Sequence, residues 1–270
     1  MLDLHCHILP GIDDGAKDLD TALAMAQIAI DDGIDTIACT PHIYPGMYEN
    51  TAAGIRAAIV AFQAELDQRG MPLKLLEGAD VYLEPGLDAA IKADRVPTLA
   101  RSRYLLLEPP HHVMPPHFEE TVFGLKMAGY VPVITHPERL TWVPDHYDVL
   151  ARMVNAGAWM QITSGSITGR FGGTPKHLCE RMLDDGLVHL IATDAHNLSR
   201  RAPHLAEGRD AAATRVGAAE AEHMVTTRPA GIVADTPPDQ LPPLPQAKPE
   251  RRQQPRSLWQ KLVGGDKVRW

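Results

Sequence analysis

Seven short apolar, strand-forming segments recur along the chain, and stretches with helical spacing separate them. The apolar segments lie at 2–6, 35–40, 73–79, 103–108, 131–135, 158–163 and 188–193. Between them, apolar residues recur every three or four positions, as at 18–32 and 52–69. This alternation predicts parallel strands joined by right-handed crossovers. Seven such units favour an α/β fold of the closed (β/α)7, TIM-like kind, with an open doubly wound sheet as the alternative.

The composition changes after about residue 235, where the pattern of strands and helices stops. We therefore predict a barrel domain at 1–235 and a tail at 236–270. Prolines crowd the start of the tail, at positions 237, 238, 242, 243, 245, 249 and 255, so it should be extended and flexible. The basic residues near the apolar segment 257–263 could dock weakly on a partner or an anionic membrane, and a solvated tail without fixed structure is the alternative.

Charge and cysteine content narrow the class of protein. The chain has 26 basic and 34 acidic residues, a formal net charge of -8, which gives no general electrostatic reason to bind nucleic acid. Its three cysteines are scattered and form no disulfide framework. The sequence starts without a basic and apolar leader. We expect a cytoplasmic protein, and the oligomeric state stays open.

Histidines and carboxylates stand where the predicted strands end. His5 and His7 are two residues apart at the end of the first strand, as are Asp194 and His196 after the last. Because side chains alternate along a strand, both members of each pair face the same side. The strands between them end near four further candidates, and the loop after the first strand adds a fifth: His42, Asp80, Glu108, His136 and Asp14.

All nine of these side chains should meet, since parallel barrel strands bring their carboxyl ends to one rim. Five imidazoles and four carboxylates are too many for one ion, which takes about four to six ligands. Carboxylates that bridge two or three divalent ions are therefore expected. The mixed nitrogen and oxygen set suits manganese, iron or zinc better than calcium.

The motifs His5-Cys-His7, Pro41-His42, His136-Pro-Glu-Arg139 and Asp194-Ala-His196 resemble the polymerase and histidinol phosphatase (PHP) family. The segment 3–15, with Asp13-Asp14-Gly15 at its end, is most similar to the CpsB/CapC branch, the bacterial tyrosine phosphatases of capsular and exopolysaccharide synthesis. The resemblance spans about residues 1–228. It implies a distorted (β/α)7 barrel of the PHP fold, up to three metal ions and ligand roles for all nine residues. One departure is Asp80, where that branch usually has Glu.

The same resemblance implies a protein-tyrosine phosphatase that acts on the tyrosine kinase governing polysaccharide polymerisation, by attack of metal-activated hydroxide. Two arginines, Arg139 and Arg201, match its substrate-binding positions, and their paired N–H groups suit phosphate oxygens. Arg200 is expected to be a bystander. A small-molecule phosphatase, such as a histidinol-phosphate phosphatase, and a catalytically silent metal-binding regulator are the alternatives.

A thiolate phosphatase does not fit this sequence. That mechanism requires an arginine six positions after the reactive cysteine, in a loop that cradles the phosphate. The corresponding positions after Cys6, Cys39 and Cys179 hold Ile12, Pro45 and Asp185. The cysteines are therefore expected to be small core residues.

Several other polar residues adjoin the predicted site. The loop histidines 111, 112 and 117 could line its rim but are expected to be solvated, and His189 and His223 are expected to hold no metal. Asp13 and Glu138 could orient ligands. The segment 163–166 offers hydroxyl groups near the same rim.

Overall fold

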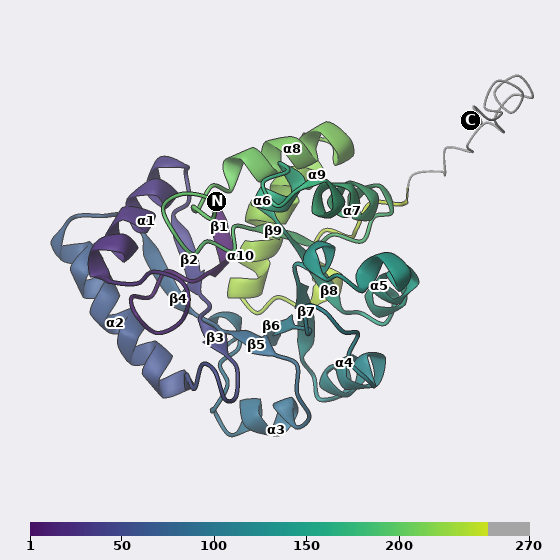
Figure 1. The fold of residues 1–270 in the computed structure, drawn as a ribbon, viewed down its shortest axis with the longest axis horizontal. Coiled ribbons are helices and arrows are strands. Elements are labelled where there is room, and N and C mark those ends of the chain that lie inside the picture. The colour runs from purple at the N-terminus through teal and green to yellow at the C-terminus, as the bar shows by residue number, and fades with distance from the viewer. Residues whose placement is uncertain (248–270) are drawn as a thin grey trace, which may run out of the picture.

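In the computed structural model, which describes residues 1–247, strands surround a central axis and helices cover their outer side (Figure 1). The strands are β1 (Leu2–Cys6), β2 (Thr36–Cys39), β3 (His42–Ile43), β4 (Lys74–Glu77), β5 (Asp80–Tyr82), β6 (Tyr104–Glu108), β7 (Val131–Thr135), β8 (Trp159–Thr163) and β9 (Leu190–Ala192). The α-helices are α1 (Leu19–Asp31), α2 (Ala52–Gln68), α3 (Leu87–Lys92), α4 (Phe118–Met127), α5 (Tyr147–Asn155), α6 (Ser164–Ile167), α7 (Gly173–Asp184), α8 (Ala206–Val216), α9 (Ala218–Glu222) and α10 (Arg228–Val233).

Each predicted apolar segment contains one strand, and two further short strands that were not predicted, β3 and β5, follow the second and third segments. All pairings between these strands are parallel, in the orders β1-β2-β4 and β3-β5-β6-β7-β8-β9. Pro41 separates β2 from β3 and has no N–H to give to a ladder. Gly78 separates β4 from β5, and a Cβ there would lie 3.0 Å from the side chains of Leu99 and Thr40. Within residues 1–247, the barrel therefore has seven strand positions but nine strands, because β2 with β3 and β4 with β5 each occupy one position.

The barrel closes between its first and last strands. The Asp194 N–H donates to the His5 carbonyl at 2.8 Å, and the His7 N–H donates to the Ala195 carbonyl at 2.9 Å. Below these bonds, the buried Asp3 carboxylate accepts from both the N–H and the hydroxyl of Thr193. The predicted barrel is thus confirmed and the open-sheet alternative is wrong.

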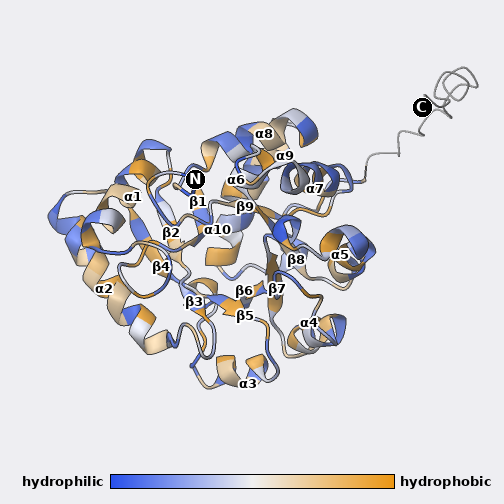
Figure 2. Cartoon of the chain, viewed as in Figure 1, coloured by the Kyte–Doolittle hydropathy of each residue, from blue (hydrophilic) through white to orange (hydrophobic). Residues whose placement is uncertain are grey.

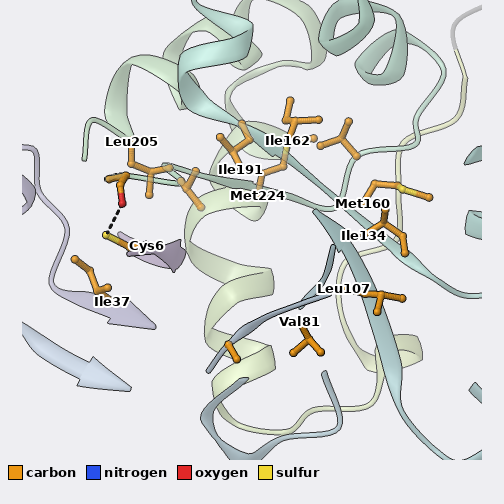
Figure 3. Close-up of a cluster of buried hydrophobic side chains, with 14 of the residues drawn as sticks. Cys6, Ile37, Val81, Leu107, Ile134, Met160, Ile162, Ile191, Leu205 and Met224 are labelled. Carbon is orange, nitrogen blue, oxygen red and sulfur yellow. Dashed lines mark hydrogen bonds between the residues drawn. The ribbon is translucent and has the colours of Figure 1, made fainter. Parts of the chain in front are cut away.

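Strand residues divide between two apolar layers. Ile37, Leu107 and Ile134 belong to a cluster between the strands and the outer helices (Figure 3). Their direct neighbours Ala38, Leu106 and Val133 belong to a second cluster, which includes Ile232 of α10. Apolar colouring accordingly follows the strands and the inward sides of the helices in Figure 2. Because Glu108 lies two residues beyond Leu106, the same strand face that packs apolar side chains lower down presents polar groups at its end.

Side chains cap the starts of α1 and α2. The carboxylate of Asp18 accepts from the Thr21 N–H at 2.8 Å and caps α1, and the hydroxyl of Thr51 accepts from the Gly54 N–H at 3.2 Å and caps α2. The two predicted helices at 18–32 and 52–69 are therefore confirmed to within a residue at each end.

The chain between residues 236 and 247 is mainly extended and lies against the barrel. The buried Arg228 side chain donates to the carbonyls of Pro242 at 3.0 Å and Pro243 at 2.9 Å. Leu241 packs against Gly231 of α10, where a Cβ would collide with it. The segment 257–263, predicted to dock on a partner or a membrane, lies outside the described residues. Among residues 1–247, none of the helices has the length and apolarity needed to cross a membrane.

Candidate metal centre

All nine predicted side chains converge at the carboxyl ends of the strands. Potential ligand atoms lie within 4.8 Å of one another in each of four overlapping groups: His7, Asp14, His42 and His196; His5, His7 and Asp80; His42, Asp80 and Glu108; and Glu108, His111 and His136. Asp194 completes the nine through close approaches to three histidines. The groups share members, so together they form one continuous cluster rather than four separate sites.

His5, His7 and Asp194 form the innermost part of the cluster. The Nε2 atoms of His5 and His7 are 3.2 Å apart, and Asp194 Oδ1 lies 3.3 Å and 3.5 Å from them. All three side chains are buried. Two imidazole nitrogens that point at each other and at one carboxylate oxygen form an arrangement that suits a shared cation.

Asp80, His42 and Glu108 form the middle part. Asp80 Oδ2 lies 3.4 Å from His5 Nε2 and 3.6 Å from His42 Nδ1. Glu108 Oε2 lies 3.3 Å from the same His42 nitrogen. Each carboxylate therefore faces more than one imidazole, which is the arrangement that a bridging ligand requires.

Asp14 and His196 lie at the more open edge. Asp14 Oδ1 is 3.5 Å from His42 Nε2 and 3.3 Å from His196 Nε2. The Asp14 side chain is 44 % exposed, whereas that of His196 is 3 % exposed. A Cβ on the neighbouring Gly15 would collide with the His7 carbonyl, so this loop can approach β1 closely only with glycine at that position.

Several polar atoms of the cluster are buried without a hydrogen-bond partner in the described structure. They include both carboxylate oxygens of Asp80, Nδ1 of His42, Nδ1 of His136 and Nε2 of His196. Leaving a buried polar group unsatisfied costs about 1–3 kcal/mol. Divalent cations would satisfy the carboxylates and the unprotonated imidazole nitrogens together, so the residues present fit metal ions.

Two of the nine residues adopt backbone conformations that are uncommon outside glycine. His136 has φ 35° and Asp194 has φ 50°, both in the left-handed region. His136 directly follows the last residue of β7, and Asp194 lies two residues beyond the last residue of β9. Such conformations cost about 1–3 kcal/mol and cluster at functional sites. Here they turn the side chains of both residues into the cluster.

Burial lowers the pKa of both His5 and His7, but the neighbouring charges shift the two pKa values apart. Burial lowers the pKa of His7, and the charge of His196 contributes, so that it falls to about 4. Burial also disfavours the charged form of His5, but the carboxylates of Asp80 and Asp194 raise its pKa to about 9. Despite its own burial, Asp194 has a pKa well below the usual range because Arg201 and His5 stabilise its charge. The centre thus concentrates negative charge in the interior.

Residues behind the cluster orient its histidines. Asp13 Oδ2 lies 2.7 Å from His7 Nδ1, and Gln161 Oε1 lies 2.8 Å from His5 Nδ1. With Nδ1 donating in each case, Nε2 is left free to bind a cation. Asp13 was a candidate from its position, whereas Gln161 was missed. Gln161 could have been recognised as a polar side chain in the middle of an apolar strand, where it is fully buried and needs a hydrogen-bond partner.

Both predicted arginines reach the cluster from loops. Arg201 Nη2 donates to Asp194 Oδ2 at 2.6 Å, and Arg139 Nη1 donates to the same oxygen. The Arg139 guanidinium also lies over the Phe171 ring, 4.7 Å from its centroid. Arg200 instead donates to the backbone carbonyl of Arg170 at 3.4 Å. The structure therefore brings Arg139 and Arg201, but not Arg200, against a cluster carboxylate.

The histidines named in the sequence analysis outside the nine differ in their distance from the cluster and in their exposure. His111, which could line the rim or be solvated, lies at the rim against Glu108 and His136, with its side chain 32% exposed. His112 is exposed, and the His117 side chain is 82 % exposed, as expected. His189 stacks on Trp159 at 4.7 Å, below the cluster. Glu138 is buried and accepts from the Thr163 N–H at 2.9 Å, so it ties the loop after β7 to the end of β8.

The three cysteines are buried and reduced. Burial raises the pKa of Cys39 and, well above the usual range, those of Cys6 and Cys179. Cys6 donates to the carbonyl of Ala195 at 3.9 Å (Figure 3). Neutral, inaccessible thiols cannot act as nucleophiles.

Comparison with known proteins decides the family. The model of the family "Capsular polysaccharide synthesis, CpsB/CapC" matches residues 1–234. The chain belongs to the CpsB/CapC family. The chain is similar to the tyrosine-protein phosphatase YwqE of Bacillus subtilis, with 37% identity over 207 residues that cover 77% of this chain and 82% of YwqE. It is also similar to the tyrosine-protein phosphatase CpsB of Streptococcus pneumoniae, with 29% identity over 242 residues, 87% of this chain and 99% of that protein.

Solved structures agree with this CpsB/CapC assignment. A chain from the crystal structures of YwqE and CpsB, described as unique metal-dependent tyrosine phosphatases, superimposes with a TM-score of 0.86 and 32% identity, covering 93% of this chain and 100% of the other. The L-hydantoinase of Arthrobacter aurescens has a TM-score of 0.50 at 13% identity, covering 92% of this chain and 73% of that enzyme. The second likeness concerns the barrel fold alone.

Proposed function

We propose that this chain removes phosphate from phosphotyrosine on the tyrosine kinase that governs polysaccharide polymerisation. The observation that carries the proposal is the placement of two arginines beside a cluster of nine potential metal ligands. Membership of the CpsB/CapC family supports it, because YwqE and CpsB are named tyrosine-protein phosphatases. The chain is a metal-dependent tyrosine phosphatase of that type. The proposal adds that its substrate is the tyrosine kinase.

The nine residues would hold two or three divalent ions, with manganese as the first candidate and iron or zinc as alternatives. The donors are His5, His7, Asp14, His42, Asp80, Glu108, His136, Asp194 and His196. Bound ions supply positive charge to phosphate oxygens and lower the pKa of water, which provides hydroxide near neutral pH. Asp13 and Gln161 support this role, since each fixes the Nδ1 side of a histidine and leaves Nε2 toward the cluster.

Arg139 and Arg201 would bind the phosphate oxygens that the ions do not reach. Each guanidinium carries five N–H groups, and the two share Asp194 Oδ2 as one acceptor. Their side chains are 16% and 21% exposed, so both reach solvent at the mouth of the cluster. The remaining donors can then take part in paired hydrogen bonds to a phosphate. Asp194 holds both arginines in place while its other oxygen faces the histidines.

The surroundings of the cluster favour an aromatic phosphoester on a protein. Tyr48 stacks on His42 at 5.5 Å, and Phe171 lies against Arg139, so flat rings flank the position that a phosphate would take. The loops that follow β3, β6 and β9 each carry an exposed apolar side chain: Met47, Val113 and Leu198. Apolar groups around a charged centre suit the residues that flank a phosphotyrosine in a polypeptide.

Substrate preference tests this function. The metal-loaded protein should hydrolyse a phosphotyrosine peptide with a kcat/KM at least about tenfold higher than that for histidinol phosphate. A preference for histidinol phosphate would replace the proposal with a small-molecule phosphatase. Full metal content without turnover of either compound would instead identify a metal-binding regulator.

A further inference from the structure

A loop histidine outside the nine residues lies against the metal cluster. His111 Nε2 is 3.4 Å from Glu108 Oε1, and its ring centroid is 5.1 Å from that of His136. The same Glu108 oxygen is 3.7 Å from His136 Nε2. Three potential ligand atoms from these residues lie within 4.8 Å of one another. His111 therefore faces the same small volume as two of the nine.

The backbone of this loop is fixed. The carbonyl of His111 accepts from both the N–H and the hydroxyl of Thr141, at 2.9 Å and 3.1 Å. The carbonyl of Pro110 accepts from the indole N–H of Trp142 at 2.9 Å. Trp142 is itself buried and meets the ring of Phe118 edge-on at 5.8 Å. Because residues 141 and 142 follow the 136–139 turn, the loop that carries His111 is attached to the segment that carries His136.

Few carboxylate oxygens face the side of the cluster where His111 and His136 lie. Asp80 Oδ2 lies 3.4 Å from His5 Nε2 and 3.9 Å from His136 Nε2, so it sits closer to the inner histidines. Glu108 has one oxygen toward His42, at 3.3 Å, and the other toward His111 and His136. An ion beside His136 would thus receive one imidazole and one oxygen of Glu108, with the short side chain of Asp80 further away.

We propose that His111 is a tenth residue of the metal centre, which binds through Nε2 the ion that Glu108 and His136 also hold. A neutral imidazole supplies one nitrogen donor and completes a mixed nitrogen and oxygen set. The side chain is 32% exposed, so it can turn toward an ion without repacking the core. The inference rests on the metal centre of the proposed function, but not on the identity of the substrate.

The neighbouring His112 provides a matched control, because it is exposed on the same loop and its ring lies 6.2 Å from that of His111. We compare the wild type with H111A, H111Q and H112A. Each protein is stripped with chelator and titrated with Mn²⁺, and the bound metal is counted by mass spectrometry after gel filtration. Electron spin-echo modulation of the bound Mn²⁺ reports how many imidazole nitrogens coordinate it.

H111A should bind the weakest ion about 10- to 100-fold less tightly and lose one imidazole signal, while H112A matches the wild type. H111Q can still donate a hydrogen bond to Glu108 but lacks the imidazole, so it should resemble H111A. Wild-type affinity and spectrum in H111A, or full recovery in H111Q, would overturn ligation by His111. A wild type that binds none of Mn²⁺, Fe²⁺ and Zn²⁺ would overturn the metal centre as a whole, and this outcome is distinct from a failure of His111 alone.

Discussion

Asp13 Oδ2 and His7 Nδ1 lie 2.7 Å apart, and this contact determines which face of the imidazole meets the cluster. The same carboxylate accepts from the N–H of Gly15 at 2.9 Å and of His42 at 3.2 Å. Asp13 thus ties together β1, the loop after it and the start of β3. Asp13, which is not itself one of the nine, thus fixes the positions of two expected metal ligands, His7 and His42.

Removal of this orienting carboxylate should weaken metal binding. In D13A we expect about 10- to 100-fold lower affinity for Mn²⁺, as is usual when a histidine ligand loses its outer hydrogen-bond partner. D13N keeps an acceptor oxygen and should fall between D13A and the wild type. Isothermal titration of chelator-stripped protein measures the affinities. Unchanged affinity in D13A would show that His7 needs no support from Asp13.

The two arginines should act on substrate rather than on metal retention. R139Q and R201Q should each lower kcat/KM for a phosphotyrosine peptide by about 10²- to 10³-fold, because each removes charged donors from the phosphate. R200Q is the matched control and should stay within about twofold of the wild type. Metal content is measured in parallel by mass spectrometry. An unaffected kcat/KM in R139Q and R201Q would reject the phosphate clamp.

Buried His189 should make the stability of the protein depend on pH. Burial, together with the charge of Arg228, holds its pKa well below the 6.5 of the exposed group. The unfolded chain therefore binds a proton that the folded chain excludes. Stability from this group is complete above about pH 6.5 and falls with acidification by about 1.4 kcal/mol per pH unit.

The test compares the free energy of urea unfolding of the wild type and H189Q across this range, both in chelator. The difference between the two proteins should shrink as the pH falls from about 6.5 to about 5.5, since glutamine cannot take up the proton. A difference that stays constant with pH would show that His189 does not titrate on unfolding.

The buried ion pair between Arg228 and Glu220 should stabilise the base of the barrel. Their closest atoms are 2.7 Å apart, and the Arg228 side chain is fully buried. E220Q leaves a buried guanidinium without its counter-charge and should cost about 3–5 kcal/mol in urea unfolding. The double variant R228M/E220Q should cost less than the sum of the two single variants. Additive losses would mean that the two side chains stabilise the fold independently.

Much of the fold could be predicted from the sequence because the barrel depends on a repeated local pattern. Buried parallel strands need continuous apolar segments, and the intervening helices need apolar residues every three or four positions. The strand breaks at Pro41 and Gly78 were harder to predict from the sequence. Strand and turn there are decided by contacts with distant residues, as in the approach of Leu99 to Gly78.

The convergence of the nine residues was also predictable, since strand ends of a parallel barrel meet at one rim. The residues that orient or extend the cluster were harder to find. Gln161 is one polar residue within an apolar strand, and its partner His5 is 156 positions away. His111 lies in a loop whose path depends on bonds to Thr141 and Trp142. No local pattern specifies such long-range contacts.

Dependence of phosphotyrosine hydrolysis on bound metal tests the central claim most directly. The purified chain is assayed on a phosphotyrosine peptide as isolated, after removal of metal by chelator, and after reloading with Mn²⁺, with D194N as the control. We predict that activity disappears with the metal, returns on reloading, and is absent from D194N throughout. Activity that persists in protein shown by mass spectrometry to contain no metal would contradict the account.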